Sequence, residues 1–340
     1  MITVTEFRGD RREWDAFIES APDSTISHSS RWADIIEQVY GHRSTLLMAR
    51  EHGRIVGVLP LVDVCSLVFG RFTVSMPYLN GGGPIGSAAA VAALSDAAEA
   101  HAQRHRMNLL ELRCRAALPI QWSAVNEKVA CVLSLATTPA DLWSRLGSKL
   151  RSQIRRPMKE GLEVRFGSDQ LDPFFRVFAR NMRDLGSPPH PQRFFEEIAH
   201  AFGAAVWFGC VYLRGMPVAG GCALVWRDEI EMTWASSLRE FSACAPNMLL
   251  YWSFIERACE AGLQRFDFGR CTPNSGSHRF KQQWGARDLA LYWYRTRNHQ
   301  GRELPKQSEG SLSLASRLWR RMPARVATTL GPRLRGGIPS

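Results

Sequence analysis

The densest group of polar and aromatic residues in the chain lies in the stretch RFDFGRCTPNSGSHRFKQQWGAR, residues 265–287. Phe266 and Phe268 alternate with Asp267, and successive side chains point to opposite faces of a strand. A strand that buries both rings therefore turns the carboxylate to its other face. The stretch predicts a short strand over residues 265–268 with one acidic side chain on its polar face.

A turn and a short helix are expected after this strand. Phe280 and Trp284 are four residues apart and can pack inward from one helical turn, while Lys281 faces outward. Asp267, Arg270 and Lys281 would then gather around the end of a strand, where they can bind an anion and stabilise an oxyanion. The alternative is a structural ion pair between Asp267 and Arg270, with Lys281 in solvent.

The surrounding chain predicts the rest of one domain. Helices are predicted over Phe174–Leu185, Phe194–Phe202 and Asn247–Ala261, and strands over Ala205–Leu213, Val218–Trp226, Glu229–Ser236 and Leu289–Tyr294. This order indicates an α+β fold and not a doubly wound parallel sheet. The helix start at Asn247 has unpaired amides that can receive a phosphate, although every helix start has such amides.

A basic helix marks the boundary between two predicted domains. Thr138 is placed to cap it, and Pro139 occupies the first helical position. Its apolar stripe is Leu142, Leu146, Leu150 and Ile154, and its cations are Arg145, Lys149, Arg151, Arg155, Arg156 and Lys159. The cations form either a solvated face or an anion-binding one. We therefore expect domains over residues 1–136 and 137–300, followed by a basic tail over residues 301–340.

The first half of the chain is predicted to contain a similar series of strands and helices. Strands are predicted over Ile2–Phe7, Leu46–Arg50, Ile55–Val64, Phe69–Ser75, Leu109–Cys114 and Lys128–Leu135, and helices over Arg12–Ser20, Ser30–Tyr40 and Ala88–His105. Gly81, Gly83 and Gly86 formally match a dinucleotide fingerprint. However, Pro84 removes an amide that would face a pyrophosphate, so a glycine-rich connection is predicted instead.

One histidine pair in this half has the spacing of a helical metal site. His101 and His105 are four residues apart, but no carboxylate joins them in the sequence, and Arg104 and Arg106 would repel a cation. We therefore predict a solvated helix face there and expect no metal site.

Composition bounds the class of protein. The chain has 340 residues and a formal net charge of +11, with eight Lys or Arg and two acids in residues 301–340, which suggests anionic partners. The eight cysteines form no CxxC pair and are expected to be reduced thiols, neither zinc ligands nor disulfides. Pro60 and Asp63 interrupt the longest apolar run, and residues 1–14 lack the layout of an export signal. A cytoplasmic globular protein is expected.

Five segments resemble the FemAB-like branch of the GNAT superfamily, particularly the FemAB-related proteins associated with exosortase systems and exopolysaccharide gene clusters. They are residues 150–156, 181–190, 246–252, 266–270 and 280–285. The resemblance is dense from about residue 145 to 295 and looser in the first half. It implies an α+β fold of two tandem GNAT-like domains, each a mixed, mostly antiparallel sheet flanked by helices.

The resemblance also implies an enzyme that moves an acyl or aminoacyl group from an activated donor onto an amine. On this pattern no cofactor is permanently bound, the donor is acyl-CoA or aminoacyl-tRNA, and the acceptor is a peptide or polysaccharide precursor of the cell envelope, which can be lipid-linked. The usual GNAT pyrophosphate loop is absent from residues 238–246, which contain no glycine. That departure puts CoA binding in doubt.

The same pattern suggests roles for individual residues. Lys281 falls where a cationic residue assists the acceptor or the transition state, and Asp267 is a candidate base near the acyl-transfer cleft. The candidate substrate-binding residues are Arg270, Arg151, Arg155, Asn247, His278 and Trp234.

A rival function of another class comes from the tail. Leu318, Met322 and Val326 recur every four residues beside Trp319 and several arginines, although Pro323 interrupts the pattern. This predicts either a basic amphipathic segment that binds an anionic membrane or a disordered basic tail. The rival is therefore a non-catalytic adaptor at a membrane surface. A tRNA partner also fits the charge, but no aromatic-basic RNA-binding motif supports it.

Overall fold

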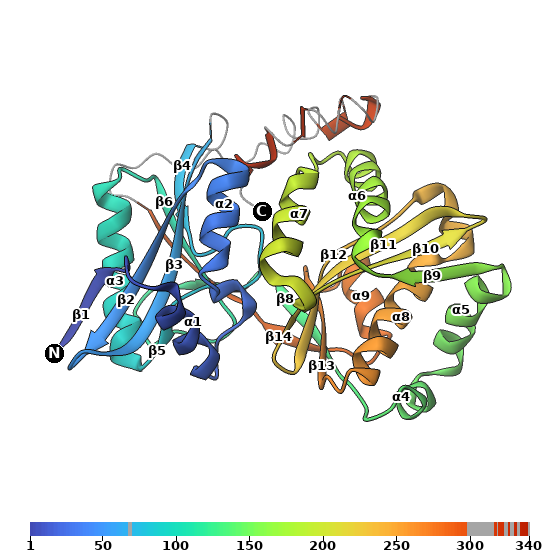
Figure 1. Ribbon diagram of the computed structural model, residues 1–340, viewed down its shortest axis with the longest axis horizontal. Coiled ribbons are helices and arrows are strands. Elements are labelled where there is room, and N and C mark those ends of the chain that lie inside the picture. Colours follow the sequence, from blue (N-terminus) through green and yellow to red (C-terminus); the bar gives the residue numbers. More distant parts are fainter. Residues whose placement is uncertain are drawn as a thin grey trace. The chain divides into compact units, whose positions relative to one another are not determined.

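The structure is a computed structural model, and it describes residues 1–66, 70–297, 316–317, 319–322, 326, 330–331 and 334–338. The chain divides into two compact units. The first contains Met1–Glu127 and residues 290–297 and 334–338, and the second contains Lys128–Leu289 and the described residues from 316 to 331. Each unit has one mixed, mostly antiparallel sheet flanked by helices (Figure 1).

The first unit is built on a sheet whose strands are antiparallel except for one pair, β4 and β6. In spatial order its strands are β1 (Ile2–Glu6), β2 (Arg43–Glu51), β3 (Arg54–Ser66), β4 (Gly70–Val74), β6 (Leu109–Cys114), β15 (Tyr292–Arg297) and β7 (Ala124–Val125), with β5 (Ile85–Gly86) paired to β3. Its helices are α1 (Arg11–Ser20), α2 (Arg31–Tyr40), α3 (Ala88–Arg104) and the short η1 (Ile26–His28).

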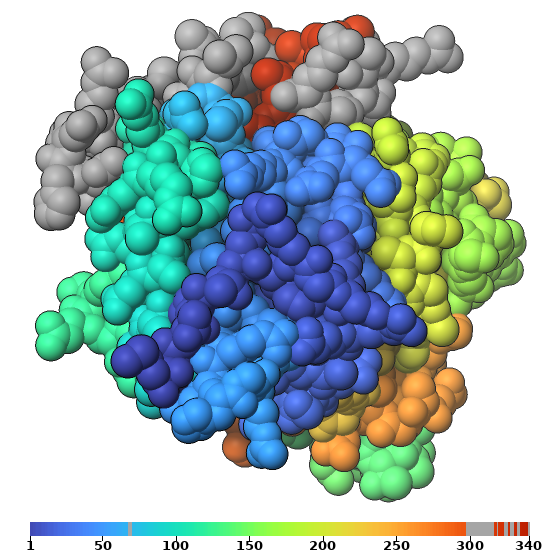
Figure 2. Space-filling model, turned by 60° about the vertical axis from the view of Figure 1, so that its left-hand side comes forward, coloured from blue at the N-terminus to red at the C-terminus, as the bar shows by residue number. Residues whose placement is uncertain are grey.

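Helices α2 and α3 cover opposite faces of this first sheet because side chains alternate along its strands. On β2, Leu47 and Ala49 belong to the core under α3, whereas the Ser44 hydroxyl donates to the carbonyl oxygen of Ala33 in α2. The apolar stripe of α3 is Ala90, Leu94, Ala98 and Ala102. Helix α3 also packs beside β1, as the space-filling view shows (Figure 2).

The second unit has a sheet with one parallel pair, β12 and β13. In spatial order its strands are β14 (Arg287–Ala290), β8 (Val129–Ser134), β13 (Arg265–Cys271), β12 (Glu229–Ser237), β11 (Met216–Trp226), β10 (Val206–Leu213) and β9 (Leu162–Phe166). Its helices are α4 (Pro139–Arg145), α5 (Ser148–Lys159), α6 (Leu171–Leu185), α7 (Gln192–Phe202), α8 (Pro246–Glu260) and α9 (Gly276–Gln282), with η2 (Ser168–Gln170), η3 (Gly203–Ala205) and η4 (Arg239–Cys244).

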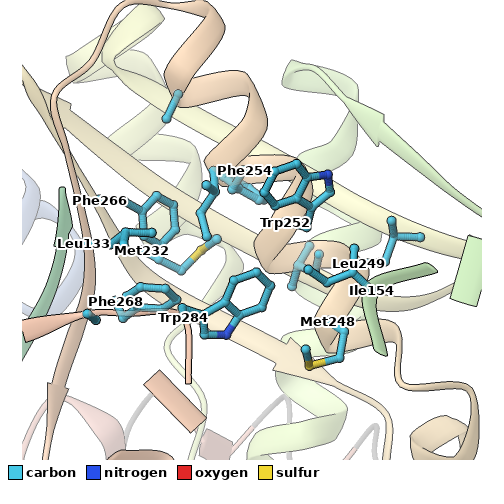
Figure 3. Close-up of a cluster of buried hydrophobic side chains, with 14 of the residues drawn as sticks. Leu133, Ile154, Met232, Met248, Leu249, Trp252, Phe254, Phe266, Phe268 and Trp284 are labelled. Atoms are coloured by element: carbon cyan, nitrogen blue, oxygen red, sulfur yellow. The ribbon is translucent and has the colours of Figure 1, made fainter. Parts of the chain in front are cut away.

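Two adjacent glycines of β11 show which helices cover each face of this sheet. A Cβ atom on Gly220 would meet Phe174 of α6 at 3.2 Å, and one on Gly221 would meet Phe254 of α8 at 3.1 Å. Neighbouring positions of a strand point to opposite faces, so α6 and α8 cover opposite sides. The core under α8 is the cluster of buried side chains in Figure 3, which includes Phe266, Phe268 and Trp284.

Several predicted boundaries differ from the structure. The predicted single basic helix is two helices, because the chain is extended at Leu146 and Gly147 between α4 and α5; its four stripe residues are nevertheless buried. Strand β8, predicted to close the first half, pairs with β13 in the second sheet. The predicted strand Leu289–Tyr294 is divided between β14 of the second sheet and β15 of the first. Periodicity identifies a strand but not its partner, which lies far away in the sequence.

The predicted amphipathic pattern of the tail lies largely outside the described residues. Within the described part, Trp319 is buried, and the Arg320 guanidinium donates to the carbonyl oxygen of Leu185 at 3.4 Å. In the first unit, the Tyr78 hydroxyl donates to the carbonyl oxygen of Gly336 at 3.0 Å. None of the helices formed by described residues has the length and apolar character needed to cross a bilayer.

Candidate functional site

The parallel strands β12 and β13 are paired over only three residues each. Residues 229–231 pair with residues 265–267, but β12 continues to Ser237 and β13 to Cys271. Beyond this register, β12 stays paired with β11, and β13 pairs again with β8. Each strand thus has backbone N–H and C=O groups that the parallel pairing does not use. We call this divergence the β12–β13 fork.

Two buried carboxylates lie where the fork begins. Asp267 is 0% exposed and stands opposite the buried Glu231 in the register of the parallel pair. The Asp267 carboxylate accepts a hydrogen bond from the Gly269 N–H at 2.7 Å. Gly269 has a φ of +73°, and the register against β8 shifts between Asp267 and Arg270, so β13 bulges here.

Lys281 reaches the same bulge from helix α9. Its ammonium donates to the carbonyl oxygens of Gly269 at 2.7 Å and Arg270 at 3.0 Å, and the residue is only 5% exposed. The prediction that Lys281 faces outward is therefore wrong, as is the alternative that it lies in solvent. The reason is that the buried face of α9 runs through His278 and Lys281, three residues apart, whereas Phe280 is only partly buried.

Two electrostatic effects change the pKa of Lys281 in opposite directions. Burial lowers the pKa of Lys281, and attraction to Cys271, Cys131, Asp267 and Glu231 counteracts this decrease. An ammonium group has three N–H donors, two of which bond to the carbonyl oxygens. Among the described residues, no further hydrogen-bond partner is assigned to Lys281, so one donor is left for a ligand.

His278 connects α9 to the edge of the second sheet. Its Nδ1 accepts a hydrogen bond from the Asn274 N–H at 3.0 Å, so in the neutral ring Nε2 carries the proton. Nε2 donates to the Asp288 carboxylate at 2.8 Å. This arrangement positions α9, and a direct role of His278 in substrate binding stays a prediction.

Three groups near Lys281 were missed by the sequence analysis. They are Glu231, Cys131 and Asp288, which come from β12, β8 and β14. The sulfur atoms of Cys131 and Cys271 lie 3.4 Å apart, and burial raises the pKa of the Cys131 thiol well above its ordinary value. No local pattern could have identified these residues, because only strand pairing brings them together.

The remaining candidate residues lie on other elements of the second unit. Arg151 and Arg155 are on α5, where the Arg155 guanidinium lies 5.1 Å from the Trp143 ring. Asn247 is in the first turn of α8. Trp234 is buried against Phe194, Phe195 and His190. The structure thus groups Arg270 and His278 with Asp267 and Lys281 around β13 and α9, while the substrate-binding roles remain predictions.

The described residues include two groups that could hold a metal ion. One is Cys131, His278 and Asp288, and the other is Asp63, His101 and His105 of the first unit. The predicted solvated face at His101 is wrong, because His101 is 6% exposed and its Nε2 lies 3.1 Å from the Asp63 carboxylate. Strand β3 supplies the carboxylate that the helix sequence lacks.

The part of the chain that contains the β12–β13 fork matches a known protein family. The match to the acetyltransferase (GNAT) domain family covers residues 148–282, from the start of α5 to the end of α9. This stretch of the second unit is therefore similar to GNAT domains. The matched range includes β12, β13 and Lys281, and the predicted resemblance of the second half to GNAT proteins is confirmed.

A curated relative supports the more specific resemblance. UDP-N-acetylmuramoylpentapeptide-lysine N(6)-alanyltransferase from Weissella viridescens is 28% identical over 137 residues, which are 39% of this chain and 40% of that protein. The chain therefore spans less than half the length of this relative. Together with the GNAT domain and the fold, this similarity confirms the predicted resemblance to FemAB-like GNAT proteins.

Solved structures show the same architecture. FemX superposes with a TM-score of 0.65 at 14% identity, covering 85% of this chain and 97% of its own. A tandem GNAT protein from the clavulanic acid biosynthesis pathway superposes with a TM-score of 0.54 at 10% identity, covering 89% of this chain and 100% of its own. At such identities the likeness concerns the fold. It confirms the predicted tandem GNAT-like architecture.

Proposed function

We propose that the protein is an N-acyltransferase whose GNAT domain moves an acyl or aminoacyl group from an activated ester or thioester to a primary amine. The observation that carries this proposal is the buried Lys281 ammonium on the carbonyl oxygens of Gly269 and Arg270 at the β12–β13 fork. The GNAT domain and the alanyltransferase relative support the same reaction class.

The chemistry requires little beyond positioning and charge stabilisation. A neutral amine attacks the carbonyl carbon of the donor, and negative charge develops on the carbonyl oxygen. In the proposed mechanism the remaining N–H of Lys281 donates to this oxygen, in an environment from which water is largely excluded. The carboxylates of Asp267 and Glu231 help to keep the ammonium protonated, and either can accept the proton that the amine loses. The bond from the carbonyl carbon to the ester oxygen or thioester sulfur then breaks, and the leaving alcohol or thiol takes up that proton.

The acceptor is proposed to be the amine of a cell-envelope precursor. The name of the Weissella relative specifies alanyl transfer to the N6 atom of a lysine in UDP-N-acetylmuramoylpentapeptide. A lysine-containing peptide precursor is therefore the first acceptor to test, and an amino sugar of an exopolysaccharide precursor is the second. A lipid-linked precursor would bring the protein to a membrane surface, where the basic tail would assist contact.

The donor is proposed to be an aminoacyl-tRNA, with acyl-CoA as the second candidate. Residues 238–246 contain no glycine and form η4 before α8, so a glycine-rich pyrophosphate loop is not present there. Arg151 and Arg155 of α5 are the cations proposed to hold the anionic donor. Both donors are made in the cytoplasm, and the reaction is accordingly placed there.

The experiment measures transfer of radiolabelled alanine from alanyl-tRNA, and of acetyl from acetyl-CoA, to the lysine-containing precursor. A Lys281→Met variant should lose at least about 100-fold in kcat/KM, the usual effect of removing one oxyanion donor. The matched control is Lys128→Met, because the Lys128 ammonium donates to a single hydroxyl, that of Thr272, at 2.6 Å. Its kcat/KM should stay within about twofold of the wild type.

Circular dichroism verifies that both variants are folded. Wild-type activity in a folded Lys281→Met variant would remove Lys281 from the mechanism, and absence of transfer with every donor and acceptor would remove the proposed function. Activity with acetyl-CoA alone would replace the aminoacyl donor while leaving the acyltransferase assignment intact.

A further inference from the structure

Three metal-ligating side chains converge in the first unit, on the face of the sheet that α3 covers. Along β3, Leu59 and Leu61 face α3, and Asp63 is the next residue on that face. Along α3, Ala98 and Ala102 face the sheet, with His101 between them. The regular alternation of both elements therefore brings a carboxylate of β3 to the last turns of α3.

The distances within this group fit a coordination sphere. Both Asp63 carboxylate oxygens lie 3.1 Å from His101 Nε2. The rings of His101 and His105 are 4.4 Å apart between centroids, and one ligand atom from each of the three residues lies within 4.8 Å of the others. Ligands at about 2.0–2.2 Å from a tetrahedral zinc ion are separated by about 3.3–3.6 Å, so the three groups need only small movements.

A neighbouring hydroxyl orients the carboxylate. Thr73 of β4 is buried opposite Asp63 in the strand register, and its hydroxyl donates to Asp63 Oδ1 at 2.7 Å. Metal-binding carboxylates commonly have such a hydrogen-bond partner in the surrounding shell. This bond leaves lone pairs of the carboxylate directed toward the histidines.

We propose that Asp63, His101 and His105 form a zinc site. Two imidazoles and one carboxylate are borderline and hard donors that suit Zn²⁺, and the half-exposed His105 leaves a coordination position for water or a ligand. His101 binds through Nε2, and its ring proton then resides on Nδ1. In the described part of the chain, the His101 ring has no hydrogen bond besides those to Asp63, so Nδ1 is free to carry that proton.

The second cluster of possible ligands differs at this point. In the group of Cys131, His278 and Asp288, the Asn274 N–H points at Nδ1 of His278. A neutral His278 must therefore carry its proton on Nε2, the nitrogen that faces Asp288, and this prevents Nε2 from binding a metal. The zinc proposal is accordingly confined to the group in the first unit.

Nearby arginines reduce the affinity of the zinc site but do not abolish it. Arg43 is opposite Asp63 in the register of β2 and β3, and Arg104 precedes His105. Both are exposed, so water and salt screen their repulsion of the metal. Asp63 is buried and interacts with the metal in a less polar environment, where its attraction is stronger.

The experiment titrates Zn²⁺ into the full chain after chelation and dialysis, by calorimetry and metal analysis. About one Zn²⁺ per chain is expected, with Co²⁺ giving the visible absorption of a tetrahedral site. His105→Ala should weaken binding by at least about 100-fold and remove the Co²⁺ absorption. Because His105 is half-exposed and at the end of α3, this variant should fold, and Asp63→Asn provides a second test.

Two controls make the result specific. His200→Ala removes an exposed histidine of α7, and Cys131→Ser disables the other cluster; both should retain wild-type binding of Zn²⁺. Zinc should raise the melting temperature of the wild type and not that of His105→Ala. No bound zinc in the wild type, or equal affinity in the wild type and His105→Ala, would overturn the proposal.

Discussion

Both units contain a short parallel strand pair that diverges into a fork, but the surroundings of the two forks differ. Each has one parallel strand pair joined by a helix, namely β4–α3–β6 in the first unit and β12–α8–β13 in the second. In each unit this pairing covers three residues per strand, 72–74 with 109–111 and 229–231 with 265–267. The two forks differ in what lies beyond the last pair.

In the first unit the chain itself fills the fork. The Ser75 N–H donates to the carbonyl oxygen of Glu111 at 2.9 Å, and the Gly83 N–H donates to that of Arg113 at 2.7 Å. The buried Arg113 guanidinium donates to the Glu111 carboxylate at 2.8 Å, and Arg295 donates to the same carboxylate at 2.6 Å. Charge and backbone groups are thus satisfied internally.

In the second unit the Lys281 ammonium lies beyond the last pair of the fork. The Lys281 ammonium donates to the carbonyl oxygens of Gly269 and Arg270 at the bulge of β13, which uses two of its three N–H groups. A filled, neutralised fork stabilises a fold, whereas a fork with an N–H donor to spare can bind a reacting group. We therefore propose that catalysis takes place in the second unit and that the fork of the first unit has a structural role.

The largest effect on stability is expected at Arg113. Arg113→Met leaves the Glu111 carboxylate buried with one of its partners removed, so the free energy of unfolding should fall by about 3–5 kcal/mol. Denaturant unfolding measures the change, with Arg8→Met as the exposed control. If Arg113→Met instead lowered kcat while leaving stability unchanged, the contrast between the two forks would be lost.

The next largest effect concerns His28, which holds the segment that fills the first fork. Its Nε2 lies 2.9 Å from the Gly83 carbonyl oxygen, and burial lowers the pKa of His28 to about 4. Between pH 6.5 and 4 the unfolded chain binds a proton that the folded protein does not. The free energy of unfolding therefore decreases as the pH is lowered through this range. The loss should reach about 3 kcal/mol.

His28→Gln should remove this part of the pH dependence. The measurement compares free energies of unfolding of the wild type and the variant from pH 7 to pH 4, with the exposed His200→Gln as control. Parallel curves for the wild type and His28→Gln would show that His28 does not stay neutral in the fold.

A pair of glycines compares the packing of the two units. A Cβ atom on Gly83 would lie 2.3 Å from the Cys114 sulfur and 2.9 Å from the Arg113 carbonyl oxygen, so Gly83→Ala should cost about 1–3 kcal/mol. Gly276→Ala, at the start of α9, meets nothing within 4 Å and should leave the melting temperature equal or higher. Equal melting temperatures for both variants would show that the first fork is not tightly filled.

The smallest effect is on the pH profile of transfer. Burial lowers the pKa of Lys281, so its ammonium loses the proton at a pH below the ordinary 10.5. Above that pKa, kcat/KM should fall about tenfold per pH unit. The alkaline limb of the pH profile measures it. In the Lys281→Arg variant the guanidinium stays charged at these pH values. If that variant lost activity at the same alkaline pH as the wild type, the titrating group would be a residue other than Lys281.

Much of the fold follows from local patterns. The stripe Leu142, Leu146, Leu150 and Ile154 was correctly predicted to be buried, and the Thr138–Pro139 helix start is present, with the Thr138 hydroxyl accepting the Asp141 N–H. The break at Gly147 was not predicted, because a spacing of four continues across a short non-helical link. Helix and strand periods are local properties, which is why these elements could be found in the sequence alone.

Local sequence patterns predicted only part of the candidate site. Phe266 and Phe268 are buried on one face of β13 and Asp267 on the other, as their alternation predicts. The contact of Lys281 with β13 could not be predicted, because its burial depends on how α9 packs against β8 and β13. A short helix has too few residues for its pattern to specify its buried face.

The sequence by itself determined the order of helices and strands, the alternation that places Asp267 opposite two buried rings, and the similarity to FemAB-like GNAT proteins. Only the tertiary structure decided that β8 and β15 are placed in different sheets, that Glu231 stands beside Asp267, and that Asp63 meets His101. The physical reason is that periodicity reports which face of an element is buried, while the partner buried against it comes from a distant part of the chain.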